Sequence, residues 1–116
     1  MSYVDGFVLP LHPDKHDAYK RMAEKFAREA AKLGGISIET LGDGLDEGKV
    51  TSFPRSVEAS DDESVVFSFI EWPDEATRNE GWKKMMEDER MNGMDMPFDG
   101  KRMFFGGFTP IVAEGR

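Results

Sequence analysis

Cysteine is absent from this chain of 116 residues, which excludes disulfide bonds, thiolate catalysis and zinc sites built on cysteine. The sequence also lacks any apolar run near the roughly 20 residues that a membrane helix needs. Its start, Met1 to Gly6, has neither the basic nor the apolar segment of an export signal. These absences predict a cytoplasmic protein with no membrane segment.

Basic residues are few, with 15 Lys and Arg against 23 Asp and Glu and a formal net charge of −8. Binding to nucleic acids and to anionic membranes draws much of its affinity from positive side chains, so we expect neither partner. The composition, 39% hydrophobic and 33% charged, is typical of a globular protein. The length predicts a single domain over residues 1–116, small enough to gain stability from a subunit interface.

No phosphate-binding loop, nucleophile constellation or metal-ligand set stands out, so we predict no metal and no cofactor. His12 and His16 have the spacing that places two imidazoles on one helical face. Pro13 separates them and no third ligand is indicated, so we interpret both as surface histidines. His16 alone remains an alternative candidate for acid–base chemistry, because the unperturbed pKa of an imidazole lies near neutrality.

Hydrophobic periodicity predicts alternating strands and helices. Gly34-Gly35 ends the first helix, and Gly81 inside the second indicates close packing. Gly106-Gly107 in the last strand indicates a bulge or a close backbone approach. The predicted order is a strand at 3–9, a helix from 12 to 33, a strand at 36–41, an acidic loop at 42–48, a short strand at 49–53, a strand at 65–72, a helix from 73 to about 90, an irregular connection at 91–96 and a strand at 102–112.

This order reduces to βαββαβ, which predicts a ferredoxin-like α+β sandwich with two helices on one face of an antiparallel sheet. The strand at 65–72 is apolar on both sides, and the last strand carries Met103, Phe104, Phe105 and Phe108. Two helices cover only one face. We therefore expect a second copy of the chain to cover the other face, forming a homodimer.

Three sequence blocks resemble the bacterial domain-of-unknown-function family 1428: residues 3–10, residues 48–55, and residues 95–103 with Gly106-Gly107-Phe108. The resemblance spans nearly the whole chain. It implies the dimeric α+β-barrel superfamily, in which two ferredoxin-like subunits pack their sheets face to face. That superfamily includes small monooxygenases, haem-degrading enzymes, isomerases and stress-response proteins. The family itself has no established reaction or catalytic residues to carry over.

Five residues are candidates for contacting a ligand: Tyr3, Asp5, Trp82, Asp99 and Arg102. With Met85 and Met86, Trp82 has the spacing to line a pocket between helix and sheet, although such a stripe is more often core. Asp5 and Arg102 lie in apolar strands and must be paired, exposed or functional. An internal pair, or one that crosses a dimer interface, is the simpler interpretation, and Asp99-Gly100-Lys101 suits an ordinary turn.

The leading hypothesis is a small homodimer, an enzyme or enzyme-like protein, that binds an apolar or aromatic metabolite between helix and sheet. Monooxygenase-like chemistry is implied by the superfamily resemblance alone. The alternative is a non-catalytic ligand-binding or stress-associated dimer, and RNA association ranks last. Converging polar groups with shifted pKa values in the pocket would favour the enzyme.

Overall fold

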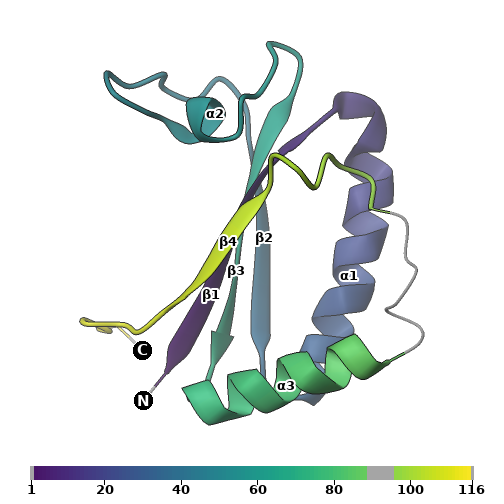
Figure 1. The fold of residues 1–116 in the computed structure, drawn as a ribbon, viewed down its shortest axis with the longest axis vertical. Coiled ribbons are helices and arrows are strands. Elements are labelled where there is room, and N and C mark those ends of the chain that lie inside the picture. Colours follow the sequence, from purple (N-terminus) through teal and green to yellow (C-terminus); the bar gives the residue numbers. More distant parts are fainter. Residues whose placement is uncertain (1, 89–95, 116) are drawn as a thin grey trace.

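The computed structural model describes residues 2–88 and 96–115, which form an antiparallel sheet with helices packed on it. Figure 1 shows α1 and α3 on one side of the sheet and the small helix α2 beyond one end of the strands. The elements in chain order are β1 (Tyr3–Leu11), a 3-10 turn η1 (Pro13–Lys15), α1 (His16–Lys32), β2 (Ile36–Gly42), α2 (Phe53–Ser56), β3 (Ser64–Trp72), α3 (Glu75–Glu87) and β4 (Phe104–Phe108).

The strands lie in the order β2-β3-β1-β4, and every neighbouring pair is antiparallel. β1 is central, with Asp5 opposite Ile70 of β3 on one side and Gly107 of β4 on the other. Helices α1 and α3 follow β1 and β3 along the chain. This is the ferredoxin-like α+β arrangement, so the predicted fold is confirmed.

The sheet face toward α1 and α3 carries most of the buried core. One cluster joins Leu9 and Leu11 of β1, each 2% exposed, to Tyr19 and Ala23 of α1. A second cluster contains Ala30, Ile70, Trp72 and Met85. Burying one large apolar side chain contributes about 1.5–3 kcal/mol, so these two clusters hold the helices on the sheet.

Helix α3 approaches the sheet closely because it contains a glycine at the contact. A Cβ atom at Gly81 would lie 2.8 Å from the ring of Trp72, which is fully buried. Real Cβ atoms essentially never show so short a contact. Close packing at Gly81, as the sequence indicates, is therefore present. Asp74 begins the helix by accepting a hydrogen bond from the backbone N–H of Thr77 at 2.7 Å.

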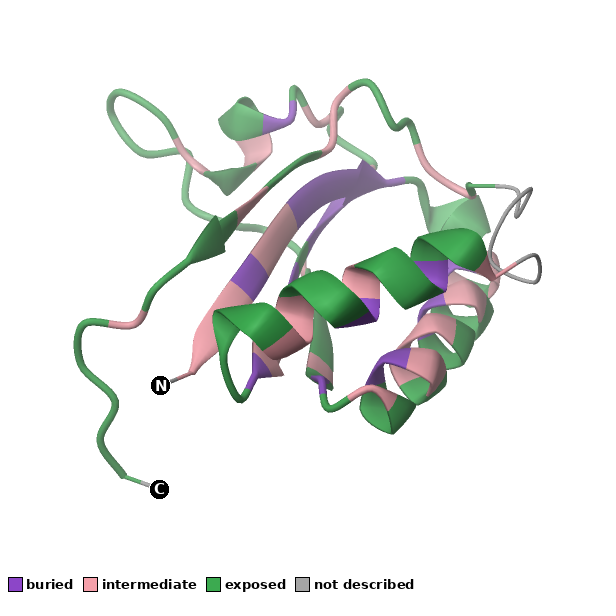
Figure 2. Ribbon diagram, turned by 60° about the horizontal axis from the view of Figure 1, so that its bottom comes forward, coloured by how far each residue is buried: buried purple, intermediate pink, exposed green. Residues whose placement is uncertain are grey.

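The opposite face of the sheet, which we call the open face, has no helix across most of its area. Figure 2 shows α1 and α3 gathered on the other side of the strands. The register places on the open face five exposed large apolar residues: Ile36, Ile38, Phe67, Phe104 and Phe108, with exposed fractions of 42–61%. Large apolar patches of this kind on a sheet commonly mark an interaction surface.

Residues 43–63 connect β2 to β3 and fold over one end of the open face. Val57 is 1% exposed and packs on Val8 and Val65. The predicted strand at 49–53 is wrong, because residues 53–56 form helix α2 instead. The Ser52 side chain caps this helix by accepting a hydrogen bond from the backbone N–H of Arg55, and Pro54 suits its first turn.

The last strand is shorter than predicted, covering Phe104–Phe108 rather than 102–112. Arg102 belongs to the preceding turn, where its backbone N–H bonds to the carbonyl of Asp99 at 3.2 Å. Gly106 and Gly107 pair regularly with β1, so there is no bulge between them. A Cβ atom at Gly107 would lie 2.8 Å from Cε2 of Tyr3, which supports the close-approach alternative.

The second helix ends at Glu87, before the expected position near Arg90. Arg90 and most of the predicted irregular connection at 91–96 lie outside the described residues, which resume at Met96. Within residues 2–88 and 96–115, no helix is long and apolar enough to cross a membrane.

Candidate functional site

A cavity of about 410 Å³ lies between α1 and the edge of the sheet formed by β2, and we call it the α1–β2 cavity. Its volume falls in the range of small-molecule sites, roughly 300–1,000 Å³. Its apolar wall is formed by Leu11, Ala23, Ala27, Leu41 and Val66. The polar residues that line it are His16, Asp17, Tyr19, Lys20, Glu24, Glu39 and Thr40.

Tyr19 and Glu39 form the central polar pair of this cavity. The Tyr19 hydroxyl donates a hydrogen bond of 2.6 Å to Oε1 of Glu39, joining α1 to β2. Burial and the neighbouring carboxylate raise the pKa of Tyr19, so its hydroxyl stays protonated. Glu39 lies on an exposed edge strand, but desolvation where its carboxyl reaches Tyr19 raises its pKa as well. The pair thus holds a carboxyl group with an increased proton affinity at an apolar wall.

His16, the first residue of α1, also lines the cavity. Its Nε2 is buried and has no hydrogen-bond partner in the described part of the chain. His12 is different, because it is exposed, its Nδ1 accepts from the backbone N–H of Asp14, and its Nε2 lies 3.3 Å from Asp62. Among the described residues, no group of three or more His, Cys, Asp or Glu could hold a metal ion.

A second polar cluster, which we call the Asp5 cluster, surrounds the carboxylate of Asp5, which is 2% exposed near the start of β1. Oδ2 of Asp5 accepts hydrogen bonds from Nε1 of Trp72 at 3.0 Å and from Nε1 of Trp82 at 2.7 Å. The guanidinium of Arg78 binds both carboxylate oxygens, with Nη2 2.7 Å from Oδ1. Five hydrogen-bond contacts from three side chains leave this carboxylate fully satisfied.

The surroundings of the Asp5 cluster are aromatic. Trp82 packs against Phe7 and Phe26 with ring centroids 6.1 and 5.4 Å apart. The guanidinium of Arg78 lies 5.3 Å from the centre of the Tyr3 ring. Hydrogen bonding to Asp5 is the main cause that raises the pKa of Arg78. The cluster therefore links β1 and β3 to α3 through an ion pair whose carboxylate is buried and whose guanidinium is partly exposed.

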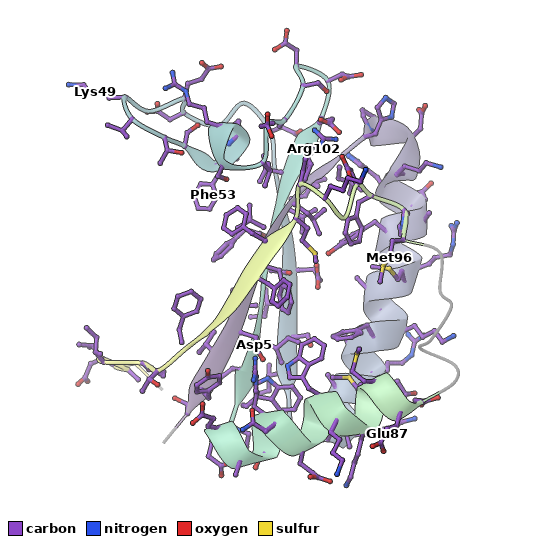
Figure 3. The ribbon with its side chains drawn as sticks, viewed as in Figure 1. Asp5, Lys49, Phe53, Glu87, Met96 and Arg102 are labelled. Atoms are coloured by element: carbon purple, nitrogen blue, oxygen red, sulfur yellow. The ribbon has the colours of Figure 1, made fainter. Side chains whose placement is uncertain are left out.

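A third cluster lies at the other end of β1, where Figure 3 shows Arg102 far from Asp5. Nη1 and Nη2 of Arg102 donate to the two carboxylate oxygens of Glu63 at 2.8 and 2.9 Å, and Nε donates to Asp99 at 2.9 Å. Nη1 also donates to the carbonyl of Glu58. Hydrogen bonds of Arg102 therefore link the end of the 43–63 connection to the turn before β4.

The Glu63 contact predicts a pH-dependent contribution to stability. Hydrogen bonding to Arg102 is the main cause that lowers the pKa of Glu63 from 4.5 to about 2. A lowered folded-state pKa stabilises the fold above the unfolded pKa, and this contribution is lost as the pH falls from about 4.5 to about 2. In urea unfolding at pH 7, we expect Glu63→Gln to lower the free energy of unfolding by about 2–3 kcal/mol.

The difference in the free energy of unfolding between wild type and Glu63→Gln should decrease towards zero as the pH falls from about 4.5 to about 2. Asp61→Asn is the matched control, because Asp61 is an exposed carboxylate two residues away. A difference in the free energy of unfolding that stayed constant from pH 7 to pH 3 would show that the contact between Glu63 and Arg102 does not stabilise the fold.

Comparison with models of known protein families identifies the family to which the chain belongs. The model of the family described as "Protein of unknown function (DUF1428)" matches residues 2–100. This chain belongs to the DUF1428 family. The "Uncharacterized protein YbaA" of Escherichia coli strain K12 is 47% identical over 117 residues, covering 98% of this chain and all of that protein. A protein of the same description from Shigella flexneri gives the same values.

The de novo designed protein Foldit4 aligns in structure with a TM-score of 0.47 and 10% sequence identity, covering 95% of this chain and 99% of that one. The region matched by the DUF1428 model contains every residue that lines the α1–β2 cavity, as well as the whole Asp5 cluster. Arg102 and β4 lie beyond it.

The structure separates the five predicted site residues into two groups. Tyr3, Asp5 and Trp82 meet in the Asp5 cluster, whereas Asp99 and Arg102 meet in the turn before β4. Asp5 and Arg102 are both paired within the chain, although not with each other. None of the five lines the α1–β2 cavity or a smaller cavity of about 180 Å³ beside Phe53.

Sequence reasoning missed the residues that make the α1–β2 cavity polar. Helical spacing places Tyr19 in an apolar stripe of the first predicted helix, and Glu39 follows the alternation of the predicted strand at 36–41. The available signal was the alternation itself. Ser37, Glu39 and Leu41 face the helices, while Ile36 and Ile38 face away. A glutamate on the helix-facing side of a strand must find a polar partner on that helix.

Proposed function

We propose that this protein is a cytoplasmic homodimer that binds a small apolar or aromatic metabolite in the α1–β2 cavity. The observation that carries the proposal is the convergence of Tyr19 and Glu39 on a cavity whose other walls are mainly apolar. Binding sites typically combine an apolar lining with a few placed polar groups that orient the ligand. The Asp5 cluster satisfies its carboxylate within the chain, so we assign it a structural role.

An enzyme is the first form of this proposal. Burial raises the pKa of Glu39 towards neutral pH, which favours exchange of a proton between this carboxyl group and a bound molecule. The protonated Tyr19 beside it can position that carboxyl. The alternative is a non-catalytic ligand-binding or stress-associated dimer that uses the same pair for orientation alone. RNA association remains the least favoured function, because the net charge is −8.

The homodimer rests on the composition of the open face. Fifteen strand residues point to this side, and among them Glu71 is the one ionisable residue, in a chain that is 33% charged. Two acidic chains would meet with least repulsion here. A second copy is the occupant that we propose, since a twofold axis lets one apolar surface cover itself.

The test of ligand binding is a thermal-shift screen of apolar and aromatic metabolites on the full chain, with hits confirmed by calorimetry. Ala27 lines the cavity from α1, so Ala27→Leu should fill part of it and weaken binding of each hit by about tenfold or more. Ala31→Leu is the matched control, because Ala31 is exposed on the same helix.

We expect at least one compound to bind wild type and the Ala31→Leu variant equally. A screen without any stabilising compound would overturn the proposal, and so would hits that bind Ala27→Leu as tightly as wild type. Chemical conversion of a hit by wild type but not by Glu39→Gln would favour the enzyme over passive binding.

A further inference from the structure

The hydrogen-bonding groups of the α1–β2 cavity are mainly acceptors. Tyr19 donates its single hydroxyl proton to Glu39, so only the lone pairs of its oxygen remain. The carboxylate of Glu39 accepts, and the Nε2 of a neutral His16 accepts in one of its two tautomers. A ligand rich in hydrogen-bond donors would satisfy these atoms. A carboxylate or ketone would place its own acceptors against them and form no hydrogen bond.

The charges of the same cavity are mainly negative. Asp17, Glu24 and Glu39 line it together with one cation, Lys20. The ammonium of Lys20 lies 4.0 Å from Glu24, its neighbour on α1. Within the described residues, no Lys or Arg lies within 4 Å of the carboxylates of Asp17 or Glu39. No positive side chain of the described residues therefore offsets the desolvation of the Glu39 carboxylate.

The apolar wall limits the rest of the ligand. Leu11, Ala23, Ala27 and Val66 can enclose an aliphatic or single-ring aromatic body in the cavity of about 410 Å³. Asp17, Lys20 and Glu24 are exposed residues of α1, and Glu39 is on the edge strand β2. The polar head of a bound molecule would therefore lie beside Glu39 at the edge of the sheet, with its apolar body against this wall.

We propose that the α1–β2 cavity selects small hydrophobic amines, placing the ammonium group between Glu39, His16 and the oxygen of Tyr19. An ammonium carries three donors and one positive charge, which matches both the acceptors and the uncompensated carboxylates. This inference rests on the proposed function, because it specifies the class of molecule that the same cavity holds.

The experiment compares three probes that share a phenyl ring and a two-carbon chain: 2-phenylethylamine, 2-phenylethanol and phenylacetate. Titration calorimetry on the full chain at pH 7 should show the amine binding about 10- to 100-fold more tightly than the alcohol. Phenylacetate should bind most weakly, because its charge has the sign of the cavity.

Glu39→Gln keeps the size of the side chain and removes its charge. In this variant, the affinity for the amine should fall about tenfold or more, to near that of the alcohol, while the affinity for the alcohol should change by less than about threefold. Asp61→Asn removes an exposed carboxylate that is not among the lining residues and should leave all three affinities unchanged.

The outcomes separate this inference from the proposed function. If the alcohol or phenylacetate binds as tightly as the amine, or if Glu39→Gln retains the preference for the amine, amine selection is wrong and an apolar ligand site remains. If none of the three probes binds while other apolar metabolites bind in the thermal-shift screen, amine selection is again wrong. If the screen also finds no ligand, the proposed function is overturned as well.

Discussion

Replacing Asp5 with alanine is expected to lower the free energy of unfolding by about 3–5 kcal/mol, the usual cost of removing one partner of a buried ion pair. The change would remove both carboxylate oxygens that accept from the Arg78 guanidinium and leave the indole N–H groups of Trp72 and Trp82 without the partner they have now. Trp72 is 1% exposed, so its indole cannot turn to water without disrupting the core.

Urea unfolding followed by tryptophan fluorescence and circular dichroism measures this effect. A loss of this size corresponds to a melting temperature lower by roughly 10–20 °C for a domain of this length. Asp61→Asn should change stability by less than about 0.5 kcal/mol, as exposed substitutions usually do. If Asp5→Ala fails to fold, Arg78→Gln provides a second test on the other partner, whose side chain is 27% exposed.

Arg78→Gln keeps the carboxylate of Asp5 and its two indole donors but removes the positive charge. We expect it to destabilise the fold measurably, because it leaves the buried carboxylate of Asp5 without its cation. Stability within about 0.5 kcal/mol of wild type for both variants would show that the Asp5 cluster does not hold α3 on the sheet.

Replacing Phe67 with glutamate is expected to convert the homodimer that we propose into a folded monomer. Phe67 is 42% exposed on the open face and contacts Phe53 and Phe69, with ring centroids 5.7 and 6.0 Å away. In a twofold dimer the substitution occurs twice and places two desolvated carboxylates in an apolar interface. Losses at hot-spot residues near the centre of an interface reach about 2 kcal/mol or more, so the dissociation constant should rise by about 30-fold or more.

Sedimentation at micromolar concentration measures this change, with circular dichroism to verify that the variant is folded. Val50→Glu is the matched control, because Val50 is 90% exposed in the 43–63 connection and does not belong to the sheet. Val50→Glu should remain dimeric. A wild-type protein that sediments as a monomer at micromolar concentration would overturn the homodimer itself.

The parts of this structure that follow short-range patterns were predictable. Alternation over residues 65–72 corresponds to β3, and the apolar stripe that starts at Tyr19 corresponds to α1. Such patterns are local, because they reflect the geometry of one strand or one helix against one apolar surface. The failure at residues 49–53 has a local cause too: Ser52 and Pro54 are better suited to starting a helix than to ending a strand.

Partners distant in the chain were not predictable. Asp5 lies 73 residues before Arg78, and Tyr19 lies 20 residues before Glu39. The sequence indicated that Asp5 needs a partner, since an unpaired charge in an apolar strand is costly. It did not identify that partner, because many arginines could supply the charge and only the path of α3 across the sheet places Arg78 beside it.

Residue order alone therefore accounts for the succession of strands and helices, the ferredoxin-like arrangement, the lack of cysteine chemistry and the acidity that disfavours nucleic acids. The packing of α1 against β2 decides where a cavity forms and which polar groups enter it. The physical reason is range: backbone periodicity depends on residues a few positions apart, whereas a site depends on side chains that meet only when the whole sheet and both helices are in place.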